Sequence, residues 1–120
     1  MSTRKFQKAS IAELVQWYAE GSIAYEQALE AADSRSANRA QNKITGAYRE
    51  LRIRGETSQL LPLLQSENET VRTNVAVHAL EFAPEFGEPV LLWIAARPGW
   101  NRTPAYYALK AWREGTLKFP

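Results

Sequence analysis

Apolar side chains recur every three or four residues along most of the chain, which is the spacing of amphipathic helices. The first helix is predicted after Ser10, because Glu13 follows three residues later and completes a capping-box pattern. We expect Gly21 to end this helix and Ser22 to cap the next one, which continues to about residue 32. No segment alternates with period two, so we predict no strand.

The same spacing predicts five further helices, each bounded by glycine, proline or a polar capping residue. Their expected ranges are 36–54, 58–65, 71–83, 87–97 and 104–115. Gly55 and Pro84 are the predicted ends of two of these helices. Thr103 is the expected cap of the last one, with Pro104 at its first position. The chain is therefore predicted to be all-helical.

A shift of 29 residues aligns three of these segments with each other. It superposes three alanines and three leucines, namely Ala47, Ala76, Ala105, Leu51, Leu80 and Leu109. A small residue lets neighbouring helices approach closely, and a leucine one turn later fills the next layer, so we expect all six to be buried. Trp17, Trp93 and Trp112 are also expected in the core, whereas Trp100 lies in a predicted turn.

The segment LLPLLQSENETVRTNVAVHAL, residues 60–80, resembles a HEAT-type repeat. It has a leucine-rich first helix and a polar turn, and Val71 and Arg72 then open a second helix with an Ala-x-x-Ala-Leu pattern. More widely, residues 11–115 resemble a family of small bacterial HEAT-like proteins of unknown function. The residues that carry this wider resemblance are Ala37, Asn38, Arg39, Glu50, Leu51, Arg52, Gly55, Leu60, Leu61, Trp112 and Gly115.

This resemblance implies an all-α fold, a compact HEAT-like α-α superhelix of about six to seven helices. We expect one domain over residues 1–120, with a flexible N-terminus at 1–8 and a C-terminal tail at 116–120. Some relatives of such proteins are proposed immunity proteins for bacterial toxins. The resemblance therefore implies an immunity or adaptor role as one version of a protein-binding function.

Composition narrows the classes of function that remain. The chain has no cysteine, so it offers no disulfide framework and no thiolate ligand or nucleophile. No apolar run is long enough to span a bilayer, and the N-terminal residues lack the apolar core of a secretory signal, so we expect a cytoplasmic protein without a membrane partner. The net charge is only +2, but residues 9–34 carry five acidic and no basic side chains, and residues 35–54 carry six basic and one acidic.

The 29-residue register also predicts a binding surface. On the helix at 71–83, a polar strip contains Asn74, His78 and Glu81. The equivalent residues of the neighbouring segments are Thr45, Arg49, Arg52, Thr103, Tyr107 and Lys110. Second helices of HEAT-like repeats line one face, so the resemblance implies a ladder of side chains across it. The predicted partner-binding residues are Arg49, Arg52, Asn74, His78, Glu81, Tyr107 and Lys110; the alternative is that this strip is only the solvated face of the helices.

A second hypothesis is a nucleic-acid-binding helical-repeat protein. Arg35, Arg39, Lys43 and Arg49 form a basic ridge that could follow phosphates, and Trp100 or Tyr107 could stack on a base. The acidic segments of the chain are as dense as the basic ones, which makes this hypothesis the weaker of the two.

Catalysis has little support in the sequence. His78 is the sole histidine, and no nucleophile is tied to it by spacing. His78 and Glu81 alone are too few ligands for a transition metal, and no phosphate-binding glycine motif is present. We therefore expect no enzyme activity, no cofactor, no metal and no small-molecule substrate.

Overall fold

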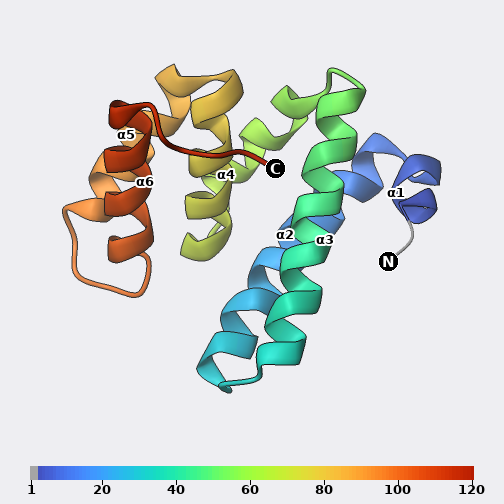
Figure 1. Ribbon diagram of the computed structural model, residues 1–120, viewed down its shortest axis with the longest axis horizontal. Helices are drawn as coiled ribbons and strands as arrows, with labels where there is room; N and C mark the ends of the chain where they lie inside the picture. The colour runs from blue at the N-terminus through green and yellow to red at the C-terminus, as the bar shows by residue number, and fades with distance from the viewer. Residues whose placement is uncertain (1–2) are drawn as a thin grey trace. The chain divides into compact units, whose positions relative to one another are not determined.

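The structure is a computed structural model that describes residues 3–120 (Figure 1). These residues form helices only, with no strand among them, so the predicted all-α class is confirmed. The helices are α1 (Arg4–Lys8), α2 (Ile11–Glu30), α3 (Ser34–Ile53), the 3-10 helix η1 (Thr57–Gln65), α4 (Glu69–Phe82), α5 (Pro84–Ala95) and α6 (Arg102–Glu114). The contacts between residues divide the chain into two units: residues up to Gln59 with Pro120 form unit 1, and Leu60–Phe119 form unit 2.

Unit 1 is built on a hairpin of two long helices, α2 and α3, which lie side by side (Figure 1). Its core is formed by side chains that are almost completely shielded from water, among them Leu14 and Tyr18 of α2 and Ile44, Tyr48 and Leu51 of α3. The predicted capping box begins α2, because the Ser10 hydroxyl accepts from the backbone of residue 13 and the carboxylate of residue 13 accepts from the Ser10 backbone. Burial of these aromatic and aliphatic side chains is the main stabilising contribution to the hairpin.

The prediction that Gly21 ends the first helix was wrong. Residues 11–30 form one continuous helix, and Gly21 is buried in its middle. A Cβ atom at this position would lie 2.9 Å from Cγ1 of Ile44 and 3.2 Å from the backbone oxygen of Ala40. Gly21 therefore permits the close approach of α2 and α3. Ser22 does not cap a helix; its hydroxyl donates to the backbone oxygen of Tyr18, one turn earlier.

Residues near the N-terminus also differ from the expectation. Residues 1 and 2 of the predicted flexible segment lie outside the described residues, but Arg4–Lys8 forms α1 and packs against α3. Phe6 is the reason, because its side chain is only 4% exposed. Burial of this large aromatic side chain helps to hold the five residues of α1 against the hairpin.

Unit 2 consists of part of η1 and three shorter helices, of which α5 packs against both α4 and α6. Its core contains Ala76, Leu80, Leu91, Ile94, Ala105 and Leu109, and Leu117 and Phe119 of the predicted C-terminal tail pack against it. The six alanines and leucines of the 29-residue register are all at most 4% exposed, as predicted. Gly87 lets α5 approach α4, since a Cβ there would lie 2.5 Å from the backbone oxygen of Ala76.

Several helix boundaries in unit 2 differ from the predicted ones. Pro84 was predicted to end the preceding helix, but it is also the first residue of the next one. α4 ends at Phe82 and α5 begins at Pro84, with one residue between them. Thr103 lies inside α6 and not at its cap, which is Asn101. The Asn101 side chain makes no capping hydrogen bond; it donates instead to the Thr70 hydroxyl over 3.2 Å. Gly115 ends α6 as the pattern predicted, with a φ of +75° that favours glycine.

Candidate functional site

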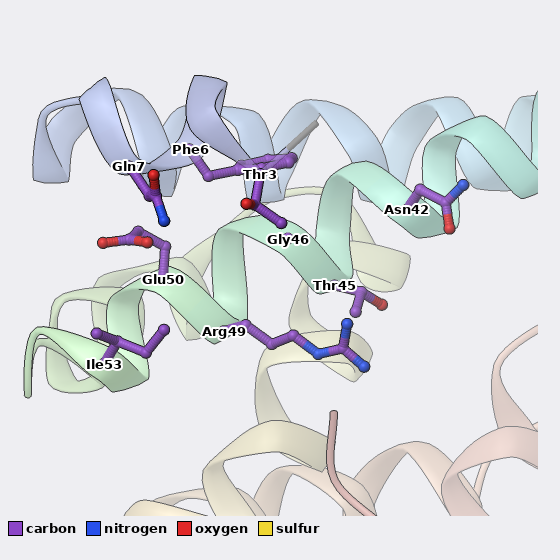
Figure 2. Close-up of a pocket in the computed structure, with 9 residues that line it drawn as sticks. All are labelled: Thr3, Phe6, Gln7, Asn42, Thr45, Gly46, Arg49, Glu50 and Ile53. Atoms are coloured by element: carbon purple, nitrogen blue, oxygen red, sulfur yellow. The ribbon is translucent and has the colours of Figure 1, made fainter. Parts of the chain in front are cut away.

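A hollow of about 490 Å³ lies in unit 1, on one side of α3 (Figure 2). Its walls come from the segment containing α1 and from one face of α3. The lining residues are Thr3, Phe6, Gln7, Asn42, Thr45, Gly46, Arg49, Glu50 and Ile53. Two of them, Thr45 and Arg49, belong to the polar ladder that the 29-residue register predicted.

The floor of this hollow depends on Gly46. A Cβ at Gly46 would lie 2.4 Å from the Phe6 ring, so the absence of a side chain lets the ring lie directly against the backbone of α3. Arg54 also holds α1, because its guanidinium donates to the backbone oxygens of Phe6 and Gln7, each over 3.1 Å. The same guanidinium forms an ion pair with Glu50 at 2.8 Å. The wall formed by α1 is therefore held against α3 by packing and by charged hydrogen bonds.

Arg49 is the cation of this hollow that has no partner among the described residues. Its side chain is exposed, and Figure 2 shows it extending along α3 toward Thr45. The neighbouring carboxylate, Glu50, is already paired with Arg54. The hollow thus presents one unpaired positive charge, and the polar residues Thr45 and Asn42 also belong to its lining.

A second candidate surface lies in unit 2, where two hollows meet at Tyr106 of α6. One has a volume of about 330 Å³ and contains Ala95, Arg102, Thr103, Tyr106 and Tyr107. The other has about 460 Å³ and contains Leu92, Ala95, Ala96, Tyr106, Leu109, Lys110, Arg113 and Glu114. Tyr106 and Tyr107 pack edge to face, with ring centroids 5.1 Å apart, and are 54% and 59% exposed. Together these residues form an apolar surface with a basic edge.

The seven predicted partner-binding residues are divided between the units. Tyr107 and Lys110 lie on the second surface, and Arg49 lines the hollow of unit 1. Arg52 of α3 lies outside that hollow, with its guanidinium carbon 5.1 Å from the centre of the Tyr48 ring. The three residues of α4, namely Asn74, His78 and Glu81, already take part in interactions within the chain.

The predicted basic ridge is partly neutralised. Lys43 forms an ion pair with Glu20 at 3.0 Å, and Arg39 donates to the Ser36 hydroxyl over 2.9 Å. Arg35 and Arg49 are exposed and have no side-chain partner among the described residues. The ion pair of Lys43 lowers the positive potential that the ridge offers to phosphates, whereas the hydrogen bond of Arg39 to a hydroxyl leaves its charge in place.

Shifted pKa values occur outside both candidate surfaces. Hydrogen bonds from Gln16 and Lys43 lower the pKa of Glu20, and hydrogen bonds from Ser36 lower the pKa of Asp33. Burial raises the pKa of the Tyr18 hydroxyl. Among residues 3–120 no three His, Asp or Glu side chains are grouped as they would be to hold a metal ion, and no helix is long and apolar enough to cross a membrane.

Sequence reasoning missed or misplaced several residues of these surfaces. Trp93, expected in the core, is 52% exposed, and the Arg97 guanidinium lies over its ring at 4.4 Å. Trp17 and Trp112 are only half-buried, and Trp100 is 54% exposed. Leu92 and Tyr106 were not singled out, although the run of 25 residues without Asp or Glu from 89 to 113 marks this region in the sequence.

Comparison with known proteins shows a shared fold. No protein-family model matches the chain, and no curated protein matches it. Among solved structures, the chain is similar to the crystal structure of the protein RPA1889 from Rhodopseudomonas palustris CGA009, with a TM-score of 0.87 and 23% sequence identity. The match covers 94% of this chain and 96% of that protein. At this identity the similarity establishes the fold alone.

Proposed function

We propose that this protein is a non-catalytic protein-binding module of HEAT-like character that uses α5 and α6 of unit 2 as its contact surface. An immunity or adaptor role is one version of this proposal. Tyr107 and Lys110, two of the ladder residues, lie on this surface, and Leu92 and Tyr106 extend it. A role for Arg49, Arg52, Asn74, His78 and Glu81 in partner binding stays a prediction.

The observation that carries the proposal is the exposure of large apolar side chains in unit 2. Leu92, Tyr106 and Tyr107 are 45%, 54% and 59% exposed, and all three line the two neighbouring hollows. Exposed aromatic side chains beside a hollow are typical of protein interfaces, where a partner removes them from water. Tyrosine is also among the residue types that contribute most to binding energy.

The charge of this region favours an acidic partner. No Asp or Glu occurs between residues 89 and 113, whereas this segment contains four basic side chains. Arg113 is paired with Glu88 at 3.1 Å, and Lys110 with Glu114 at 3.7 Å. The guanidinium of Arg102 faces the smaller hollow without a carboxylate partner among the described residues. An acidic and apolar segment of a partner protein would complement both features.

The proposal can be tested by capturing partners from a lysate of the source cell on the immobilised protein, with and without nuclease. The informative variant is Tyr107→Ser with Lys110→Glu. Its matched control is Phe86→Ser with Lys118→Glu, which removes an aromatic side chain of similar exposure (54% at Phe86) and makes the same change of charge at two residues of unit 2 that line neither hollow. We expect the immobilised protein to capture one acidic protein whether or not nuclease is added. This capture should be lost with the first variant but not with the control.

Two results would contradict the proposal. The first is equal retention of the partner by both variants, which would move the contact away from α6. The second is recovery of nucleic acid that is lost after nuclease treatment or at modest salt, because phosphate contacts weaken steeply with salt. That second result would favour the basic ridge at Arg35, Arg39, Lys43 and Arg49.

A further inference from the structure

We propose that the hollow of unit 1 is a binding site for a small organic carboxylate that carries an apolar side chain (Figure 2). The sequence indicated no small-molecule ligand. This proposal does not depend on the protein-binding surface in unit 2, because all the lining residues belong to unit 1. A volume of about 490 Å³ lies within the range of small-ligand sites.

The first argument is the charge of the hollow. Arg49 is its unpaired cation, and its planar guanidinium can donate two parallel hydrogen bonds to a carboxylate. Thr45 lies one turn before Arg49 and Asn42 lies about two turns before it, so all three follow one face of α3. Their hydroxyl and amide groups can hydrogen-bond to polar atoms next to the carboxylate.

The second argument distinguishes a carboxylate from a phosphate. Arg49 is the sole cationic side chain among the described residues that line the hollow, and Glu50 lies in the same wall. Arg54 already pairs with Glu50, so the local charge balance offers one positive charge to a ligand. A carboxylate brings one negative charge, whereas a phosphate monoester brings close to two and is usually met by more than one cation or by several backbone N–H groups.

The third argument is the apolar part of the hollow. Ile53 belongs to the lining and is 78% exposed, the highest value among the large apolar side chains of the described chain. Figure 2 shows Ile53 at one end of the labelled set, with the Arg49 guanidinium directed toward the other end. Phe6 also belongs to the lining. A ligand with a carboxylate at one end and an aliphatic group at the other would cover Ile53 and pair with Arg49.

The fourth argument is that the walls are held before a ligand arrives. The Phe6 ring lies against Gly46, where any side chain would collide with it, and Arg54 fixes the backbone of α1. A preformed site loses little conformational entropy on binding, which favours a small ligand that can make only a few contacts.

The experiment is a titration of the isotope-labelled full chain with N-acetyl-L-leucine, followed by NMR chemical shifts, beside its C-terminal amide and inorganic phosphate. We expect the acid to bind with a dissociation constant tighter than about 10 mM. The largest shift changes should fall at Thr45, Gly46 and Arg49. The amide should bind at least about tenfold more weakly, because it cannot make the charged pair with Arg49.

Two variants and one control sharpen this test. Arg49→Gln should weaken binding of the acid by about tenfold and leave the weak binding of the amide unchanged. Ile53→Asn should weaken binding of the acid but not of acetate, which has no aliphatic chain to cover. Arg35→Gln removes an equally exposed arginine from the same helix, outside the hollow, and should change neither affinity.

Three results would overturn the proposal. Equal affinity for the acid and the amide would show that no charged pair forms. Tighter binding of phosphate than of N-acetyl-L-leucine would identify a phosphate site. Shift changes away from α1 and α3, or no shift change up to about 10 mM, would show that the hollow does not bind this class of ligand.

Discussion

The two units of this chain place their aromatic side chains differently. Unit 1 contains five aromatic residues, and every one of them is buried or half-buried, with Tyr18 and Tyr48 completely shielded from water. Unit 2 contains eight, of which five are exposed, namely Phe86, Trp93, Trp100, Tyr106 and Tyr107. Aromatic residues therefore stabilise the core of unit 1, whereas in unit 2 most of them face outward.

The difference follows from the packing of the helices. In unit 1 two helices of 20 residues form a long hairpin, and large side chains fill the space between them. In unit 2 the buried core is made of alanine, valine, leucine and isoleucine, mostly on helices of 12 to 14 residues. Large exposed side chains add little to the stability of a unit that does not bury them, and this exposure is the basis of the proposed contact with a partner.

The largest expected effect tests this comparison directly. Tyr48→Ala should lower the free energy of unfolding by at least about 3 kcal/mol, because it leaves a cavity in a closely packed core. Tyr107→Ala removes the same atoms from a surface position and should change it by no more than about 0.5 kcal/mol. Urea unfolding followed by circular dichroism measures both. Similar losses in the two variants would contradict the distinction between a structural and an exposed tyrosine.

A second prediction compares two glycines at which neighbouring groups approach the backbone closely, Gly87 in unit 2 and Gly46 in unit 1. Gly87→Ala should destabilise the protein by about 2 kcal/mol, since its Cβ would meet the backbone oxygen of Ala76, which cannot move without shifting α4. Gly46→Ala should cost less, about 1 kcal/mol, because the atoms in its way belong to the Phe6 ring at the end of a side chain. Thermal unfolding of both variants shows which substitution destabilises the protein more. The reverse order would mean that Phe6 is held more rigidly than the contact between α4 and α5.

The smallest expected effect concerns pH and unit 1 alone. Hydrogen bonds from Ser36 lower the pKa of Asp33 below its ordinary value of 3.8 at the start of α3. A lowered folded-state pKa means that the carboxylate stabilises the protein above pH 3.8, and that this contribution is lost as the pH falls through the folded-state pKa.

Unfolding midpoints of wild type and Asp33→Ala between neutral and acidic pH measure this loss. The two proteins should differ at neutral pH and converge in strong acid. A difference that stays constant over the whole pH range would contradict a role for the charged form of Asp33. Gln41→Ala is a suitable control, because it removes an exposed side chain of the same helix that does not titrate.

Some helix ends and buried positions could be predicted from the sequence, because they depend on residues that are close together along the chain. The capping box at Ser10 and Glu13 and the glycine end of α6 at Gly115 depend on neighbours a few residues away, and both are present. The buried alanines and leucines of the 29-residue register follow from helical periodicity. The candidate surfaces were only partly predicted from the sequence, since Tyr107, Lys110 and Arg49 were named but Tyr106, Leu92 and Ile53 were not.

What the sequence determined by itself was the all-helical class, most helix positions and the burial of the alanines and leucines in the 29-residue register, because these depend on side-chain spacing and capping within about one turn. Only the tertiary structure decided that Gly21 continues a helix, that Phe6 holds α1 against Gly46, and that Trp93 faces solvent. Each of these outcomes depends on residues distant in the sequence, whose packing can reverse a local preference for a turn, a flexible end or a buried position.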